Sequence, residues 1–200
     1  MKALVIVDIQ YDFLEGGSLA VPEGNEVIPV INALQKDFDL IVATQDWHPI
    51  RHKSFAVEHP GKQAFEVIDL NGLPQVLWPV HCVQGTKGAE FHEALNIRPI
   101  EGIFRKGMNP EVDSYSGFFD NGRRKNTGLY GFLKDRNIEE VHVCGLAADF
   151  CVSYTANDAL DLGFKTFIHE AGTRPIDPKN WKKIKKDFLK KGGVLVGEEN

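Results

Sequence analysis

The chain has 200 residues, 42% of them hydrophobic, a size and composition that suit one α/β domain with a sizeable core. Its formal net charge of −5 provides no general basic surface, so we expect no nucleic-acid partner. Three cysteines without framework spacing argue against a disulfide-stapled secreted fold, and no apolar stretch reaches transmembrane length.

Short apolar runs alternate with helical patterns along most of the chain. Strands that are apolar throughout and are separated by helices indicate a parallel sheet covered on both faces. We therefore predict one α/β domain over residues 1–200, with three α-β-α layers and a mostly parallel sheet of about six strands. The predicted strands are residues 3–7, 40–44, 102–105, 140–144, 166–169 and 193–196, and the predicted helices are residues 25–34, 128–135, 151–162 and 178–191.

Local signals refine these elements. The first strand is too short for the apolar core of a signal peptide, so we expect a soluble, cytoplasmic protein without a membrane partner. Asn25 is a suitable N-cap for the first helix, and Gly163 and Gly192 are placed to end the last two. The sequence leaves the number of subunits open, and a homo-oligomer is compatible with it.

The pattern breaks between residues 46 and 100. This stretch holds five of the ten prolines, five of the seven histidines and little periodicity. A long irregular segment in a compact domain is usually functional or a separate lobe. We interpret it as an insertion that lies over the strand ends.

Reactive side chains follow four of the predicted strands. Asp8 follows the first, Asp46 the second, Lys106 the third, and Cys151 comes after the fourth. Any one of them has an ordinary explanation as a turn or cap residue. Because ligands of open parallel sheets bind beyond the carboxyl ends of the strands, the four together predict an active site there.

Cys151 opens a predicted helix, where free N–H groups and the helix dipole favour a thiolate. Asp8 is suited to take the thiol proton, and Lys106 to hold that carboxylate and favour the thiolate. A cysteine–histidine pair is missing: His169 is the one histidine at a predicted strand end, and nothing around it marks it as a base. The pattern therefore departs from papain-like proteases.

Asp46 and His48 lie two residues apart on an extended segment and so point the same way. With His81 they offer one carboxylate and two imidazoles, ligands suited to a divalent transition metal. Taken alone, this segment is more often a loop with a hydrogen-bonded aspartate than a metal site. His52 remains open as a further ligand or a partner of the ligands.

Five segments together carry a resemblance. They are VDIQYDFLEGGSLAV, TQDWHP, WPVHCVQGTKGAEF, KGMNPEVDSYSGFFD and GLAADFCVSYTANDAL. This set, which spans nearly the whole chain, resembles the nicotinamidases of the isochorismatase-like cysteine hydrolase family. The family shares the aspartate, lysine and cysteine, while the two histidine segments are specific to the nicotinamidase branch.

The resemblance implies an amidohydrolase that converts nicotinamide to nicotinate and ammonia in NAD salvage, through a cysteine thioester. It implies Cys151 as nucleophile, Asp8 as general base and Lys106 as its cationic partner, with an oxyanion hole from the N–H groups of Ala147 and Cys151. The Leu146–Ala147 peptide matches a cis bond of the family.

The resemblance also assigns the pocket. It implies Asp46, His48 and His81 as ligands of a zinc ion, with manganese or iron as alternatives, which binds the pyridine nitrogen and positions the substrate. Phe13 and Trp78 match aromatic residues that flank the nicotinamide ring, with Leu19 nearby.

Two alternatives remain. The same three catalytic residues serve relatives that act on another small amide, ureido or enol-ether substrate, and those relatives generally lack the metal ion. A non-catalytic binding module of this fold is expected to have lost Asp8, Lys106 or Cys151, and the chain keeps all three.

Overall fold

A six-stranded parallel sheet forms the centre of the protein in this computed structural model, which describes residues 1–197. The strand order is β5-β2-β1-β6-β7-β8, so the chain starts in the middle and builds outward in both directions. The strands are β1 (Lys2–Val7), β2 (Leu40–Asp46), β5 (Gly102–Lys106), β6 (Glu140–Leu146), β7 (Lys165–Arg174) and β8 (Val194–Val196).

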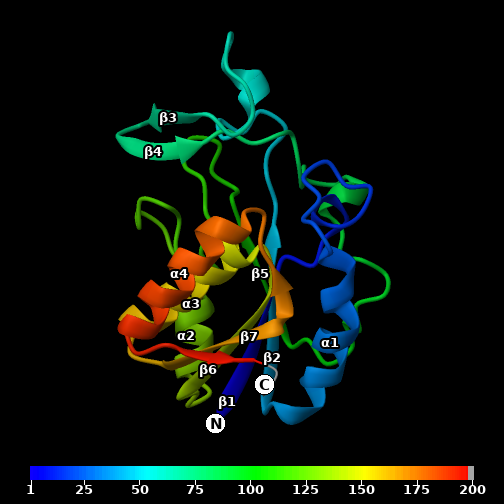
Figure 1. The fold of residues 1–200 in the computed structure, drawn as a ribbon, viewed down its shortest axis with the longest axis vertical. Coiled ribbons are helices and arrows are strands. Elements are labelled where there is room, and N and C mark those ends of the chain that lie inside the picture. The colour runs from blue at the N-terminus through cyan, green and yellow to red at the C-terminus, as the bar shows by residue number, and fades with distance from the viewer. Residues whose placement is uncertain (198–200) are drawn as a thin grey trace.

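Helices cover both faces of this sheet (Figure 1). Helix α1 (Val27–Leu34) lies on one face, and α2 (Leu129–Lys134), α3 (Ser153–Asp161) and α4 (Pro178–Lys190) lie on the other. This arrangement confirms the predicted three-layer α-β-α fold with a central parallel sheet.

The core follows from the apolar strands. Residues 3–7 of β1 have no exposed surface, and all seven residues of β2 are buried. Gly145 lies inside β6, with φ +113°. A Cβ there would overlap the backbone of Val7, so glycine is what lets β6 lie against β1.

Two helix starts differ from the prediction. Helix α1 begins at Val27 without a side-chain cap, and Asn25 lies in a preceding 3₁₀ turn, where it accepts a hydrogen bond from the Glu15 N–H at 2.9 Å. Helix α3 begins at Ser153, after a π-helical turn, Ala148–Val152, that contains Cys151. The predicted C-terminal glycines, Gly163 and Gly192, do follow α3 and α4 in left-handed conformations.

The predicted insertion is more ordered than its composition suggested. It contains an antiparallel hairpin of β3 (Val67–Leu70) and β4 (Leu73–Val76), together with short 3₁₀ turns. Asn71 and Gly72 both have positive φ, the conformation of a two-residue type I′ hairpin turn. In Figure 1 the hairpin projects beyond the carboxyl end of the sheet.

Among the described residues, no helix has both the length and the apolar character needed to cross a membrane.

Candidate active site

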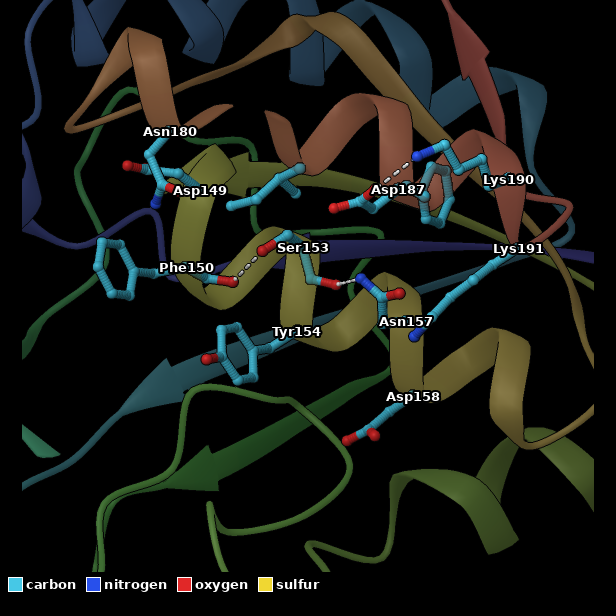
Figure 2. Close-up of a pocket in the computed structure, with 12 residues that line it drawn as sticks. Asp149, Phe150, Ser153, Tyr154, Asn157, Asp158, Asn180, Asp187, Lys190 and Lys191 are labelled. Atoms are coloured by element: carbon cyan, nitrogen blue, oxygen red, sulfur yellow. Dashed lines mark hydrogen bonds and ion pairs between the residues drawn. The ribbon is translucent and has the colours of Figure 1, made fainter. Parts of the chain in front are cut away.

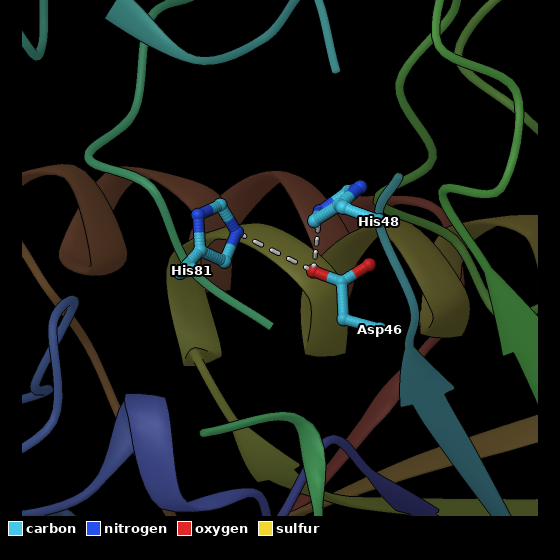
Figure 3. Close-up of side chains that lie close together, drawn as sticks. All are labelled: Asp46, His48 and His81. Atoms are coloured by element: carbon cyan, nitrogen blue, oxygen red, sulfur yellow. Dashed lines mark ion pairs between the residues drawn. The ribbon is translucent and has the colours of Figure 1, made fainter. Parts of the chain in front are cut away.

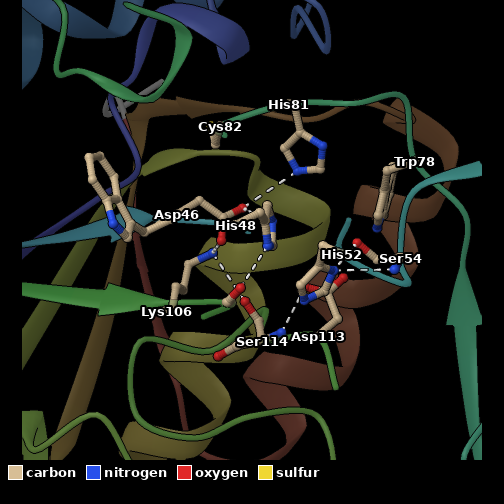
Figure 4. Close-up of polar contacts among 12 residues, drawn as sticks. Asp46, His48, His52, Ser54, Trp78, His81, Cys82, Lys106, Asp113 and Ser114 are labelled. Atoms are coloured by element: carbon tan, nitrogen blue, oxygen red, sulfur yellow. Dashed lines mark hydrogen bonds and ion pairs between the residues drawn. The ribbon is translucent and has the colours of Figure 1, made fainter. Parts of the chain in front are cut away.

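Lys106 lies at the centre of the site. It ends β5, directly opposite Asp46 at the end of β2 in the strand register, while Asp8 follows β1. Its Nζ atom lies 2.8 Å from Asp8 Oδ2, 3.0 Å from Asp46 Oδ1 and 3.4 Å from Cys151 Sγ. Nζ also donates to the Ser114 carbonyl at 3.1 Å (Figure 4). The structure thus brings together the four side chains that the sequence placed beyond the strand ends.

Charge and burial set the protonation of this group. Burial alone would lower the pKa of Lys106, but Asp46 and Asp8 outweigh it and raise that pKa well above its usual range. Burial raises the pKa of Asp8 even though Lys106 opposes the shift. For Asp46, the charges of His48 and Lys106 overcome burial and hold the pKa well below its ordinary value. Lys106 is therefore an ammonium placed between two carboxyl groups whose pKa values shift in opposite directions, upward for Asp8 and downward for Asp46.

The Cys151 environment corrects the expectation of a free thiolate at a helix N-terminus. Cys151 is the fourth residue of the π-helical turn and is 7% exposed. Burial raises the pKa of its thiol well above the usual range, and Asp8 and Asp46 raise it further against the effect of Lys106. Because this shift disfavours the thiolate, Cys151 requires a base to act as a nucleophile.

Asp46, His48 and His81 form a second, adjoining group (Figure 3). Asp46 Oδ2 lies 3.2 Å from His48 Nε2 and 3.6 Å from His81 Nε2. The other ring nitrogens are held by carbonyl groups: His48 Nδ1 by Gly107 at 2.9 Å and His81 Nδ1 by Pro79 at 2.8 Å. Both Nε2 atoms consequently face the same carboxylate.

This group fits a divalent metal ion. Its three donor atoms lie within 4.8 Å of one another, and among residues 1–197 the buried His48 Nε2 has only the Asp46 carboxylate opposite it, at 3.2 Å. Carbonyl groups that orient the second ring nitrogen are usual around metal-bound histidines. Gly107 is required here, because its φ is +67° and a Cβ would overlap the His48 ring.

His52 lies beside this group rather than within it. Its Nδ1 contacts Ser54 Oγ at 2.7 Å, and its ring centre lies 4.3 Å from that of His48 (Figure 4). It forms a separate candidate donor set with His48 and Asp113. Burial lowers the pKa of His52 to about 4, so the ring is neutral near pH 7.

A pocket joins the two groups. It brings together all the residues that the resemblance assigned to the ring, Phe13, Leu19 and Trp78, with Cys151 and Ala147. The Leu146–Ala147 peptide beside it is cis. The full lining is Phe13, Leu19, Asp46, Trp78, His81, Asp113, Tyr115, Ala147, Phe150, Cys151 and Ile176.

Four lining residues were missed from the sequence. Asp113 and Tyr115 belong to the KGMNPEVDSYSGFFD segment, and Phe150 directly precedes Cys151. The signal available for these three was their closeness in sequence to Lys106 and Cys151. Ile176 had none, because it comes from the loop after β7. Its N–H donates to Asp149 Oδ1 at 2.9 Å, which ties this wall to the turn that carries Cys151.

His169 is not part of the site. It lies inside β7, and its Nε2 contacts His142 Nδ1 of β6 at 3.0 Å, near Phe38. This agrees with the absence of a sequence signal for a histidine base.

A wider groove between α3 and α4 contains none of the predicted site residues (Figure 2). Within it Ser153 Oγ donates to Phe150 O at 3.0 Å and Asn157 Nδ2 to Ser153 O at 2.8 Å. Lys190 pairs with Asp187 at 3.2 Å on α4. These polar groups are largely satisfied by one another, so the reactive pocket is the smaller one at Cys151.

Comparison with known proteins agrees with this geometry. Residues 2–199 match the Isochorismatase domain. The chain is 48% identical over 180 residues to the nicotinamidase of Escherichia coli, covering 88% of this chain and 84% of the relative. A solved nicotinamidase of Acinetobacter baumanii superposes with a TM-score of 0.95 at 47% identity, over 98% and 95% of the two chains. A Pyrococcus horikoshii pyrazinamidase in complex with zinc gives 0.81 at 35% identity, covering 98% of each.

Proposed function

Since the chain belongs to the isochorismatase family, we propose that it hydrolyses nicotinamide to nicotinate and ammonia, a reaction of NAD salvage. One observation carries the proposal. The nucleophile, base and ammonium group of Cys151, Asp8 and Lys106 converge beside a pocket whose far side holds a metal-ligand set. The three free cysteines suit a reducing compartment, and we place the activity in the cytoplasm.

The first half-reaction forms a thioester. Asp8, whose pKa is raised by burial, takes the proton of the Cys151 thiol as the sulfur attacks the carboxamide carbon. Lys106 contacts both groups and stabilises the negative charge wherever it lies. Asp8 then gives the proton to the amide nitrogen as the carbon–nitrogen bond breaks, and ammonia leaves.

The second half-reaction releases nicotinate. Asp8 takes a proton from a water molecule, whose oxygen attacks the thioester carbon. The carbon–sulfur bond breaks, and the proton returns to Cys151. Asp8 thus acts as base and acid in turn. This double role requires the pKa of Asp8 to lie between that of an ordinary aspartate and neutral pH.

The N–H groups of Ala147 and Cys151 form the oxyanion hole. Both residues line the pocket: Ala147 directly precedes the π-helical turn Ala148–Val152, and Cys151 lies near the end of that turn. Within that turn the N–H groups of Phe150 and Val152 already donate to the Ala147 carbonyl, at 3.2 and 3.1 Å. Fixed backbone donors of this kind stabilise the charge that develops on the carbonyl oxygen.

Asp46, His48 and His81 hold one divalent ion, for which zinc is the first candidate because a related pyrazinamidase is solved with it. When bound, the ion supplies a ligand position for the pyridine nitrogen of the substrate. Phe13, Leu19 and Trp78 enclose the ring, so the carboxamide is directed to Cys151. The intact ligand set argues against activity on another amide, ureido or enol-ether substrate, because relatives with those activities generally lack the metal ion.

The test is ammonia release from nicotinamide by metal-loaded protein, by protein treated with a chelator, and by Cys151→Ala. We expect release that chelator abolishes, that added zinc restores, and that Cys151→Ala lowers by roughly 10⁴-fold or more. No release from nicotinamide contradicts the proposed substrate. Release that persists after complete metal removal contradicts the metal's role and favours the metal-free relatives.

A further inference from the structure

Gln10 is a fully buried side chain that contacts the metal-ligand set only through the backbone. Its Oε1 accepts the Asp46 N–H at 2.8 Å, and its Nε2 donates to the Asp46 carbonyl at 2.8 Å. The same Nε2 also donates to the Ala89 carbonyl at 2.9 Å. The amide therefore satisfies both backbone groups of one residue and connects them to the insertion.

These bonds replace a missing strand. Strand β1 pairs with β2 only as far as Val7 opposite Thr44, because the chain turns away at Asp8, whose φ is +50°. Asp46 extends two residues farther and pairs with Lys106 on its other side. The Gln10 amide supplies, on the β1 side, the donor and acceptor that a continuing strand would have offered.

The position of Asp46 matters to both halves of the site. One carboxylate oxygen, Oδ1, contacts Lys106 at 3.0 Å, while the other, Oδ2, faces His48 and His81. A displacement of the Asp46 backbone therefore moves a metal ligand and a partner of Lys106 at once.

We propose that Gln10 is the positioning residue that sets both the metal-ligand group and the Lys106 group, by holding the backbone of Asp46 at the end of β2. It is neither one of the candidate metal ligands nor a residue that lines the pocket, and it lies two residues beyond the proposed base, Asp8. The structural part of this inference is independent of the substrate; its effect on turnover rests on the proposed function.

The chain offers a matched control. Gln45 is also buried and its Nε2 donates to the same Ala89 carbonyl, at 3.0 Å, but its Oε1 accepts from Arg105 and its amide makes no hydrogen bond to Asp46. The variants are Gln10→Met, which removes all three bonds, Gln10→Glu, which keeps only the acceptor, and Gln45→Met. Zinc affinity is measured by competition with a chromogenic chelator, and folding by circular dichroism.

We expect both Gln10 variants to bind zinc roughly 10- to 100-fold more weakly than the unaltered protein, the range seen when partners of metal ligands are removed. Gln45→Met is expected to change the affinity by less than about 3-fold, since it leaves Asp46 in place. At saturating zinc, kcat stays reduced in the Gln10 variants because Lys106 is displaced as well. Unchanged zinc affinity in a folded Gln10 variant overturns the proposal.

A measurement on the unaltered protein covers the case in which neither variant folds. The Asp46 amide, which donates to Gln10 rather than to a strand, is expected to exchange with deuterium as slowly as amides inside β2, and fast exchange overturns the proposal. The experiments separate the positioning role of Gln10 from the proposed nicotinamide hydrolysis. Weaker zinc binding without any nicotinamide hydrolysis leaves this inference standing, whereas hydrolysis with unchanged zinc binding removes it alone.

Discussion

Lys106 shows most clearly how single residues determine this site. Its ammonium is fully buried and lies within 3.0 Å of two carboxylates, so it neutralises charge that the interior would otherwise exclude. Its pKa is raised by those same carboxylates, which keeps the positive charge at any pH at which the enzyme works. The residue therefore serves the stability of the fold as well as the reaction.

Replacing Lys106 with methionine, which has a similar length, leaves Asp8 and Asp46 facing each other without a cation. We expect the free energy of unfolding at pH 7 to fall by about 3–5 kcal/mol, and hydrolysis to be lost. Urea unfolding measures the first effect. Lys185→Met is the control, because Lys185 pairs with Glu170 at 2.7 Å near the surface and should cost at most about 1 kcal/mol. Equal losses in the two variants contradict this account.

The protonation of Asp8 predicts a pH dependence. Because its pKa is raised by burial, the carboxylate needed as base is lost, as the pH falls, at a higher pH than for an ordinary aspartate of pKa 3.8. The sign for stability is opposite: the protonated form stabilises the native state at low pH, and this contribution is lost as the pH rises through the raised pKa.

The measurement is kcat/KM against pH, with metal occupancy followed in parallel so that loss of the ion is separated from protonation of Asp8. We expect an acid limb above pH 3.8 while the metal remains bound. A kcat/KM that stays constant down to pH 3.8 in fully metal-loaded enzyme contradicts the role of Asp8.

At the scale of elements, the π-helical turn Ala148–Val152 and the loop before α4 form one unit. Asp149 accepts the N–H groups of Ile176 and Asp177 through its two carboxylate oxygens, each at 2.9 Å. Ile176 lines the pocket, and Asp177 caps α4 by accepting the Lys179 N–H at 2.8 Å. The turn that carries the nucleophile therefore also places a wall of the pocket.

Asp149→Ala removes both acceptors and leaves two N–H groups without them. We expect a loss of about 1–3 kcal/mol in the free energy of unfolding and a rise in KM for nicotinamide, because Ile176 is released. Asp177→Ala, which removes only the helix cap, is expected to cost about 1 kcal/mol and to leave KM unchanged. A KM that rises equally in both variants would show that α4, rather than Asp149, holds the pocket wall.

Elements were predicted best where the signal is local. The strands were recognised because each is an apolar run between helices, and Gly163 and Gly192 end their helices as expected. The β3–β4 hairpin was overlooked although Asn71-Gly72 is a strong turn signal, because the surrounding prolines and histidines masked the two short strands. The π-helical turn at Cys151 had no signal, since its shape depends on the packing of the site.

At the scale of the whole molecule, the metal site ties the insertion to the sheet. His81 comes from the insertion, whereas Asp46 ends a central strand, so an ion between them joins both parts. A ligand that binds only the native state adds to stability by mass action. Zinc should therefore act on the global unfolding of the protein as well as on catalysis.

Removing the metal with a chelator is expected to lower the unfolding temperature, and zinc at 100 times its dissociation constant to restore about 2.7 kcal/mol. Calorimetry with and without zinc measures the difference. In His81→Ala, which lacks one ligand, the zinc-dependent shift should shrink or disappear. An unfolding temperature that does not respond to zinc in the unaltered protein contradicts a site built by Asp46, His48 and His81.

The sequence by itself determined the kind of fold and the chemical groups of the site. Apolar strands alternating with helices specify a covered parallel sheet, and side chains placed after parallel strands must arrive at one edge, as Asp8, Asp46 and Lys106 do. Only the tertiary structure decided how these groups behave. Burial raises the pKa values of Cys151 and Asp8, while the neighbouring carboxylates raise that of Lys106 and keep it charged, and a side chain such as Gln10 gains its role from the backbone that lies opposite it. Those effects depend on distances between residues far apart in the chain, which local pattern does not contain.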